Sequence, residues 1–598
     1  MGAMRDACQR KVQFESPSHQ GTLLSGLNTL RSQGLLLDIT LVAGGMAFRA
    51  HRVVLASCSD YFRAMFTDAM RERGQSEVAL EGVTAEGMRY LLEYAYTSRL
   101  ALSLATVQDV LSAASHVQLQ AVVEACASYL REQLDLDNCV DVATIAEMYC
   151  LQQLLKEVYL FICGNLKRFS GRPEFLRLSG AQLEYVLKCD FPVDCSEAEV
   201  LGVVLRWIEH QPHERIQYAR PLLRYVHFSE ISSADVGTYF ESPVLKCLRM
   251  GGLWSSNIGM WRAASWPQQQ QRQESALVNS RGMELAILKV GGFGISGVTN
   301  DIAYYLPGGG KWRYLTSIPH VEQCNFGTAV LHNELFVVGG CFNQSLQENV
   351  HPFGFRYSPL TNAWSTMAPM QRERCRFSLG VVGGALLAVG GAGETDVVDD
   401  CERYDPVADA WTPLASLPGP RTQHAGASWR NYLYVSGGLD QDLVLDSLWR
   451  LDTDTDRWEA CAPMITPRAD HSMVCCGDEI YVCGGWYEDE STTSRVLVDT
   501  VDCYSIVRDT WTVLTRVPTP RYHAGVAVIG ARLYIVGGFH SATTFDRASG
   551  VVECYDLESG IWTVGDNYPQ DIWEHACCTL YVPRCRDDLE VIPDKDIS

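Results

Sequence analysis

Several patterns that mark common protein classes are missing from this chain of 598 residues. It has no Cys-x-x-Cys pair, no Gly-x-Ser-x-Gly, no glycine-rich phosphate loop with a lysine and no His-Glu-x-x-His, so the usual signatures of zinc sites, serine nucleophiles and nucleotide sites are absent. No apolar run approaches the roughly 20 residues of a membrane span, and residues 1–18 lack the apolar core of a secretory signal. We therefore expect a protein that is not an enzyme, holds no cofactor or metal and does not enter a membrane.

Positive charge is also scarce. The 49 lysines and arginines are outnumbered by 71 aspartates and glutamates, which gives a formal net charge of -22. Broad binding to DNA or RNA backbones needs a basic face, so we expect no nucleic-acid partner. Many of the 22 cysteines, such as Cys475 and Cys476, lie in apolar, strand-like runs where a thiol acts as a small hydrophobe. Buried free thiols predict a reducing compartment, the cytoplasm or also the nucleus.

The chain does contain a unit that recurs about every 50 residues, a period typical of propellers. Each unit has short β-rich runs, a Gly-Gly pair and a later tryptophan, and a tyrosine precedes that tryptophan in all units but the fourth, which has Leu451. One four-stranded sheet cannot bury both faces alone, whereas a closed ring of sheets can, so the repeats predict a six-bladed, all-β propeller. The first glycines are Gly291, Gly339, Gly390, Gly437, Gly484 and Gly537, and the tryptophans are Trp312, Trp364, Trp411, Trp458, Trp511 and Trp562.

The two ends of the repeat region complement each other. No first-strand segment precedes Gly291, whereas a segment of this kind, residues 575–582, follows the last tryptophan with no Gly-Gly pair behind it. We therefore predict that the terminal segment supplies the missing strand of the first blade, which removes a free sheet edge.

The half of the chain before the repeats has a different pattern. Apolar spacing predicts an opening helix over residues 19–33, two strands within 34–50 and then helical stretches at 51–70, 86–96, 106–119 and 121–133. Residues 137–240 are helical in pattern throughout, and the glutamine-rich stretch within 255–282 is typical of a linker.

The N-terminal residues carry a resemblance to a known family. Asp38, His51 and the runs 56–66, 80–83 and 94–97 stand in the order and spacing of a BTB domain, and residues 204–209 resemble the tryptophan-bearing helix of a BACK domain. With the repeats, the whole chain resembles the BTB-BACK-Kelch (kelch-like) family. The resemblance implies a multidomain chain with a disordered N-terminus (1–18), an α/β BTB domain (19–134), an all-α BACK domain (135–254), a linker (255–283), a kelch propeller (284–583) closed by its last strand, and an acidic tail (584–598).

The resemblance also implies a function, the substrate-recognition adaptor of a cullin-3 RING ubiquitin ligase, which homodimerises through its BTB domain. Met70, Arg71 and Glu72 resemble the motif by which BTB adaptors bind cullin-3, and helices within 138–166 correspond to the adjoining contact region. Asp38 and His51 are structural in the resembled fold, and an isolated Asp and His lack the further ligand or nucleophile that metal binding or catalysis would need.

One end of the predicted propeller is the expected substrate-binding face. Arginines stand at equivalent places before the first strands and aromatic residues follow the Gly-Gly pairs, which are residue types enriched at binding hot spots. Such a face would take an acidic or phosphorylated segment. The alternative is that each arginine only bonds neighbouring loop carbonyls. The candidate residues are Arg374, Arg421, Arg468, Arg521, Gln323, Phe293, Phe342, Trp486, Tyr487 and Phe539.

Other functions of related architectures remain open to different degrees. An actin-binding or cytoskeletal scaffold, dimerised through BTB, is the main alternative. Transcriptional repression of the BTB zinc-finger type lacks its DNA reader here, and a copper oxidase of the kelch class would need clustered Tyr and His pairs that we do not find. The sequence identifies neither the substrate nor the individual family member.

Overall fold

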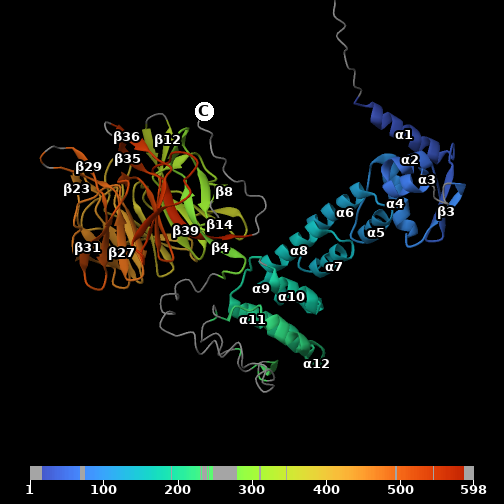
Figure 1. Cartoon of the computed structure of the whole chain (residues 1–598), viewed down its shortest axis with the longest axis horizontal. Helices are drawn as coiled ribbons and strands as arrows, with labels where there is room; N and C mark the ends of the chain where they lie inside the picture. The colour runs from blue at the N-terminus through green and yellow to red at the C-terminus, as the bar shows by residue number, and fades with distance from the viewer. Residues whose placement is uncertain are drawn as a thin grey trace, which may run out of the picture. The chain divides into compact units, whose positions relative to one another are not determined.

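The computed structural model describes residues 17–67, 74–189, 191–228, 231, 239, 242–244, 246, 279–308, 311–344, 347–489, 491, 494–542 and 545–584. The chain divides into two compact units, Met1–Val186 and Leu187–Ser598. In Figure 1 the helices of the first unit run from blue to green, and the strands of the second run from green to red. The predicted terminal segments and most of the predicted linker lie outside the described residues.

The first unit begins with a small mixed sheet surrounded by helices. Strand β1 pairs with β2 in antiparallel and with β3 in parallel register, in the order β2-β1-β3. The elements are α1 (His19–Ser32), β1 (Ile39–Ala43), β2 (Met46–Ala50), α2 (Arg52–Cys58), α3 (Asp60–Thr67), β3 (Glu77–Leu80), α4 (Ala85–Thr97), α5 (Val107–His116), α6 (Gln120–Glu132), α7 (Cys139–Met148), α8 (Gln152–Gly164), α9 (Leu166–Ser170), η2 (Pro173–Arg177) and α10 (Gly180–Lys188).

The helix predicted over residues 51–70 is interrupted at Ser59. This residue is extended, with φ of −140° and ψ of 124°, and separates α2 from α3. Its hydroxyl donates to the Val117 carbonyl at 2.6 Å and accepts from the Phe62 amide at 3.1 Å, so the side chain satisfies groups that a continuous helix would bond differently.

Asp38 and His51 hold the start of α2 in place. The Asp38 carboxylate accepts a hydrogen bond from the Arg52 amide at 2.8 Å, close to the first turn of the helix. The buried His51 ring has its two nitrogens 2.7 Å from the Tyr96 hydroxyl and 3.0 Å from the Leu35 carbonyl. Both side chains therefore have structural partners.

The second unit begins with helices that are tied to the segment before the first blade. Glu197, 2% exposed in the first turn of α11, forms an ion pair with the buried Arg281 at 2.7 Å. The Arg281 guanidinium also donates to the Leu187 and Tyr225 carbonyls, each at 2.6–2.7 Å. These helices are α11 (Glu197–His210), α12 (Pro212–Arg215), η3 (Ile216–Tyr218) and α13 (Ala219–Leu223).

The rest of the second unit consists of six four-stranded antiparallel sheets, the blades. From inner to outer strand, blade 1 contains β39 (Ala576–Pro583), β4 (Met283–Val290), β7 (Asp301–Tyr305) and β8 (Trp312–Ser317), and blade 2 contains β10 (Gly327–Leu331), β11 (Glu334–Val338), β14 (Gly354–Ser358) and β15 (Ala363–Met367). Blade 3 contains β16 (Ser378–Val382), β17 (Ala385–Val389), β18 (Cys401–Asp405) and β19 (Ala410–Leu414), and blade 4 contains β20 (Ala425–Trp429), β21 (Tyr432–Ser436), β24 (Leu448–Asp452) and β25 (Arg457–Cys461). Blade 5 contains β26 (Ser472–Cys476), β27 (Glu479–Cys483), β30 (Thr500–Ser505) and β31 (Thr510–Arg516), and blade 6 contains β33 (Gly525–Ile529), β34 (Arg532–Val536), β37 (Val552–Asp556) and β38 (Ile561–Val564).

Short strands in the loops between the blades complete the face that carries the candidate site. They are β5 (Phe293–Gly294), β6 (Gly297–Val298), β9 (Gln323–Cys324), β12 (Cys341–Gln344), β13 (Gln347–Val350), β22 (Leu439–Asp440), β23 (Leu443–Val444), β28 (Trp486–Glu488), β29 (Arg495–Leu497), β32 (Arg521–Tyr522), β35 (Phe539–Ala542) and β36 (Phe545–Ala548).

Apolar cores lie between successive blades around the whole ring. One cluster joins Ile287 and Trp312 of blade 1 to Tyr534 and Val552 of blade 6, so the first and last repeats pack as the others do. In every repeat but the fourth, the tyrosine and tryptophan face each other on the outer strands, as with Tyr404 and Trp411, whose ring centroids are 5.2 Å apart. The Trp411 indole donates to the Ala368 carbonyl of the preceding repeat at 2.9 Å, which anchors one blade to the next.

The terminal strand lies where the sequence analysis puts it. Strand β39 pairs with β4 from Ala576 opposite Val290 to Pro583 opposite Met283, and Figure 1 shows the red strand beside the green one. Leu580 and Val582 of β39 enter the core shared with blade 2. The end of the chain therefore contributes buried surface to the first blade.

The Gly-Gly pairs occupy backbone conformations that other residues seldom adopt. At Gly391 φ is +102°, and a Cβ atom there would lie 2.6 Å from the Cys375 carbonyl oxygen. Glycine is required because both the torsion and the close approach of the neighbouring loop exclude a side chain.

Candidate functional site

Six side chains, one from each repeat, surround the mouth of the central channel at one end of the propeller. We call this set the mouth ring. Its members are half-buried, and five of them follow, by two positions, the places at which the sequence analysis put four arginines and Gln323. They are Asn325, Arg376, Gln423, Asp470, His523 and Glu574.

The mouth ring is built on backbone geometry. All six residues have positive φ, between 50° and 56°. Successive members are linked by backbone hydrogen bonds, in which the amides of Arg376, Gln423, Asp470, His523 and Glu574 donate to the carbonyl of the preceding member at 2.9–3.2 Å. The left-handed conformation turns each chain at the mouth, so the position of the side chains does not depend on what those side chains are.

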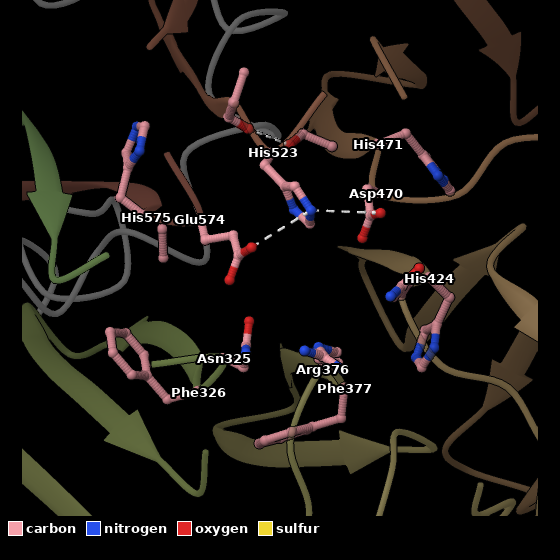
Figure 2. A pocket seen from close by; sticks show the side chains of 14 residues that line it. Asn325, Phe326, Arg376, Phe377, His424, Asp470, His471, His523, Glu574 and His575 are labelled. Atoms are coloured by element: carbon pink, nitrogen blue, oxygen red, sulfur yellow. Dashed lines mark hydrogen bonds and ion pairs between the residues drawn. The ribbon is translucent and has the colours of Figure 1, made fainter. Parts of the chain in front are cut away.

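The mouth ring combines opposite charges around a cavity of about 240 Å³. His523 Nε2 lies 3.5 Å from an Asp470 oxygen and 3.6 Å from a Glu574 oxygen, so one imidazole bridges two carboxylates. In Figure 2 Arg376 and Asn325 lie across the cavity from this group. The mouth therefore offers carboxylates and an imidazole on one side, and a guanidinium with an amide on the other.

Three histidines lie directly behind the mouth ring and are buried. Burial lowers the pKa of His424, His471 and His575 to about 3. Their rings are therefore neutral near pH 7. His424 Nε2 lies 3.0 Å from the Val389 carbonyl and His471 Nε2 lies 2.8 Å from the Ser436 hydroxyl, so each ring joins the start of one inner strand to the second strand of the preceding blade.

The predicted binding arginines lie inside the blades. Arg374, Arg421, Arg468 and Arg521 are between 0% and 3% exposed. Arg374 donates to the Gly390 and Asp400 carbonyls and pairs with Glu402 at 2.7 Å. Arg468 pairs in the same way with Asp502 at 2.5 Å, and Arg521 with Glu553 at 2.7 Å. This geometry favours the interpretation in which the arginines bond neighbouring loop groups.

Two repeats modify this arrangement. Arg421 donates to the Gly437 carbonyl at 3.2 Å and to the Ser447 hydroxyl at 3.1 Å, and burial lowers its pKa to about 10. Gln323, at the equivalent place in blade 2, is fully buried beside Cys324. A direct contact of these five side chains with a ligand remains a prediction, and their positions beneath the mouth ring make them supports for its loops.

The predicted aromatic residues lie on the loops around the mouth. Trp573 stacks on Phe293 with centroids 5.9 Å apart and contacts Phe539 at 5.0 Å, so an aromatic row crosses from blade 1 to blade 6. Trp486 donates from its indole to Asp470 at 2.8 Å, which joins it to the mouth ring. Phe342 stacks against His351 at 4.3 Å, and Tyr487 is half-buried in β28.

The mouth ring was missed by sequence reasoning, although a signal for it exists. From Asn325 to His523 its members recur with the spacing of the Gly-Gly pairs that follow them, Gly339 to Gly537. Each of the six stands directly before Phe326, Phe377, His424, His471, Ala524 or His575 at the start of an inner strand. The predicted cullin-binding residues Met70, Arg71 and Glu72 lie outside the described residues, just beyond the end of α3.

The described part of the chain contains neither a metal-binding group of side chains nor a membrane-spanning helix. Among these residues no three His, Cys, Asp or Glu side chains are grouped so that they could hold a metal ion. None of the described helices is long and apolar enough to cross a membrane.

Comparisons with known proteins cover nearly the whole chain. Residues 27–134 match the BTB/POZ domain, residues 139–241 match the BTB And C-terminal Kelch domain, residues 286–485 match the KLHDC2/KLHL20/DRC7 Kelch-repeats domain, and residues 467–518 and 520–567 match the Kelch motif. The chain is 32% identical over 586 residues to Kelch-like protein 26 of Mus musculus, covering 96% of this chain and 95% of that protein. It is 39% identical over 604 residues to Kelch-like protein 22 of Xenopus tropicalis, covering 98% and 90%.

Proposed function

Because this chain belongs to the BTB-BACK-Kelch family of kelch-like proteins, we propose that it is the substrate-recognition adaptor of a cullin-3 RING ubiquitin ligase. The BTB domain binds cullin-3 and the mouth ring of the propeller binds the protein to be ubiquitinated. The observation that carries the proposal is the mouth ring itself, where six side chains of varied chemistry converge at one end of the propeller. The adaptor supplies proximity, since it brings substrate lysines close to the charged E2 enzyme.

The cullin-binding surface is proposed at Met70, Arg71 and Glu72, with Met70 as the apolar anchor and Glu72 as the polar contact. The helices α7 and α8 correspond to the adjoining contact region. Met148 at the end of α7 is 60% exposed and Leu160 of α8 is 41% exposed, so apolar side chains are available there. Exposed large apolar residues on these two helices support a protein-binding surface there.

A homodimer through the BTB domain is proposed from the opening helix. No residue of α1 is buried in the single chain, and Leu23 is 59% exposed. An amphipathic helix gains stability by covering its apolar face, and a second copy of the same domain would cover it. The complex would act in the cytoplasm or the nucleus.

The cullin surface is tested by replacing Met70 and Glu72 with alanine. Loss of an anchor and a polar contact should cost about 1 to 3 kcal/mol of cullin-3 affinity, as at other interface hot spots, with dimerisation and melting unchanged. A matched control replaces Met46, which is 58% exposed, and the exposed Glu132. Unchanged co-purification of cullin-3 with the first variant would remove these residues from the site.

The substrate surface is tested separately at the mouth ring. Its preferred ligand is proposed to be a short acidic or phosphorylated segment with an apolar residue, because Arg376 can pair with its anion and the aromatic row can cover its apolar side chain. Arg376→Ala should abolish capture of partners from lysate while cullin-3 binding persists. Retention of the same partners would place the substrate site elsewhere on the propeller.

A pull-down with the same proteins distinguishes the ligase adaptor from the alternative, a cytoskeletal scaffold. A pull-down with the unmodified chain that retains actin and lacks cullin-3 would contradict the ligase proposal. Retention of cullin-3, with its loss in the Met70 and Glu72 variant, is the expected result.

A further inference from the structure

Three cysteines meet beneath the mouth ring, between blades 2 and 3. Cys324 lies in β9, Cys341 begins β12 and Cys375 stands directly before Arg376. They form a cluster in which each thiol is at most 1% exposed. We call them the sulfur cluster.

The geometry of Cys324 and Cys341 is close to that of a disulfide. The two residues are directly opposite each other on the antiparallel strands β9 and β12, and their sulfur atoms are 3.6 Å apart. Opposite residues on antiparallel strands have Cα atoms about 4.5 to 5.5 Å apart, which lies inside the range that disulfides span. A bond therefore needs only a small movement of two side chains.

The surroundings of Cys341 favour its thiolate. Cys324, Cys375 and Asn325 are hydrogen-bonded to its sulfur and Arg376 adds a positive charge nearby, which together lower the pKa of Cys341. Elsewhere in the propeller burial has the opposite effect and raises the pKa of Cys401, Cys483 and Cys503 to about 12. The thiolate is the reactive form of cysteine, so the sulfur cluster differs chemically from the other buried thiols.

Asn325 of the mouth ring contacts both the sulfur cluster and the cavity. The Asn325 amide nitrogen lies 3.6 Å from the Cys324 sulfur and 3.8 Å from the Cys341 sulfur, and the same residue lines the cavity of the mouth. A small oxidant in the cavity is therefore close to the pair.

We propose that Cys324 and Cys341 are a reactive thiol pair, which hydrogen peroxide converts to a disulfide at the wall of the propeller mouth. The Cys341 thiolate attacks one peroxide oxygen, the O–O bond breaks, and the sulfur becomes a sulfenic acid while the departing hydroxide becomes water by taking a proton from Cys324. The Cys324 thiolate then attacks the Cys341 sulfur, the S–O bond breaks, and the displaced hydroxide takes one proton from solvent and leaves as a second water. The two sulfurs lose two electrons and the peroxide gains them.

The bond would join two parts of the proposed binding face. Strand β9 leads into Asn325 of the mouth ring, and β12 carries Phe342 next to Cys341. A covalent link between them restrains the β12–β13 hairpin relative to the mouth. The chemistry itself does not depend on the proposed ligase function.

The test treats the full chain with hydrogen peroxide, blocks the remaining thiols and digests without reduction, using a protease that cleaves after glutamate. Cleavage at Glu322, Glu334 and Glu348 separates the two cysteines, so the disulfide appears as peptides 323–334 and 335–348 joined by a bond that reduction breaks. We expect this species at peroxide doses that also oxidise the exposed Cys150, which is the internal reference.

Variants separate the proposed pair from general oxidation. Cys324→Ser and Cys341→Ser should each abolish the joined peptides, whereas Cys401→Ser, at a buried thiol of blade 3, should leave them unchanged. Cys375→Ala should slow their formation several-fold because a donor to Cys341 is lost, and Cys375→Ser, which keeps a donor, should restore the rate. Absence of the joined peptides from folded wild-type chain while Cys150 is oxidised would overturn the proposal, as would equal rates in wild type and Cys375→Ala.

Discussion

A buried lysine in the first blade gives the most direct test of the physical reasoning. Lys289 of β4 is fully buried, at a position where the other blades have Val337, Ala388, Val435, Val482 and Ile535. Its ammonium donates to the Asp301 carbonyl at 3.4 Å, and that carbonyl accepts from the Gly291 amide. The equivalent carbonyl in blade 3, of Asp400, accepts from Arg374. In blade 1, Ile572 stands at the position equivalent to Arg374, so the loop before the inner strand provides no cation. Lys289, in the second strand, provides one instead.

The cation in blade 1 has no buried carboxylate to balance it, because Ala303 stands where blade 3 has Glu402. Burial lowers the pKa of Lys289 to about 8. Compared with an ordinary lysine pKa of about 10.4, this difference corresponds to about 3 kcal/mol. Between about pH 8 and pH 10.4 the unfolded chain holds a proton that the folded chain lacks, so the free energy of unfolding rises with pH across that window. Below about pH 8 Lys289 is charged in the folded chain, and the free energy of unfolding is reduced by the full energy of burying that charge.

Replacing Lys289 with methionine removes the charge and keeps an unbranched side chain. The variant should be more stable than the wild type by about 2 to 3 kcal/mol at pH 7, because methionine places no charge in the buried site. The gain should shrink toward zero by about pH 10. Urea unfolding followed by tryptophan fluorescence measures both values, with Lys311→Met at an exposed lysine as the control. A gain that is equal at both pH values, or a loss of stability at pH 7, would refute the reasoning.

Three further predictions concern the buried pairs, the glycines and the last strand. Glu402→Gln should lower the free energy of unfolding by about 3 to 5 kcal/mol, because it leaves the buried Arg374 charge without its partner. Asp396→Asn, in an exposed ion pair, should lower it by under about 1 kcal/mol. Equal losses in urea unfolding would contradict the difference expected between buried and exposed pairs. Gly391→Ala should lower the free energy of unfolding by at least about 1 to 3 kcal/mol, because the added Cβ meets the Cys375 carbonyl. Gly384→Ala should lower it less, because the space at that glycine is open. Thermal melting that ranks the two variants in the reverse order would refute the role of the Cys375 contact. Deletion from Glu574 onward removes β39, so the propeller should aggregate while the N-terminal half stays soluble. Deletion of residues 585–598 is the control and should be tolerated. A propeller that stays folded and monodisperse in light scattering without β39 would show that the pairing of β39 with β4 is dispensable.

The repeated architecture could be read from the sequence because it depends on large and very small residues. The tyrosines and tryptophans and the Gly-Gly pairs recur at places where packing and backbone torsion accept few alternatives. The fourth repeat shows the tolerance of the pattern, since Leu451 faces Trp458 where the other repeats have tyrosine. The division of residues 51–67 into two helices was not visible, because it depends on a hydrogen bond from Ser59 to the distant Val117.

The sequence analysis put the candidate site at one end of the propeller and interpreted the charged residues by their usual exposure. Arginine is mostly solvated, so four regularly spaced arginines suggested a binding surface. Their partners were nevertheless present in the sequence, because Glu402, Asp502 and Glu553 each stand two residues before a buried tyrosine. Alternate residues of a strand share a face, so these acids are buried and require a cation. The mouth ring could not be located in the same way, because the turn that exposes it is set by backbone torsions.

The backbone links of the mouth ring have a consequence for engineering new specificity. The hydrogen bonds that connect its members use main-chain amides and carbonyls, so the six side chains are interchangeable without loss of the bonds that position them. The positive φ at each position limits the choice, because Val, Ile and Thr are strained in that conformation, whereas Asn, Asp and Gly adopt it readily. A combinatorial library that varies Asn325, Arg376, Gln423, Asp470, His523 and Glu574, and omits β-branched residues, would therefore sample new ligand chemistries on one unchanged scaffold.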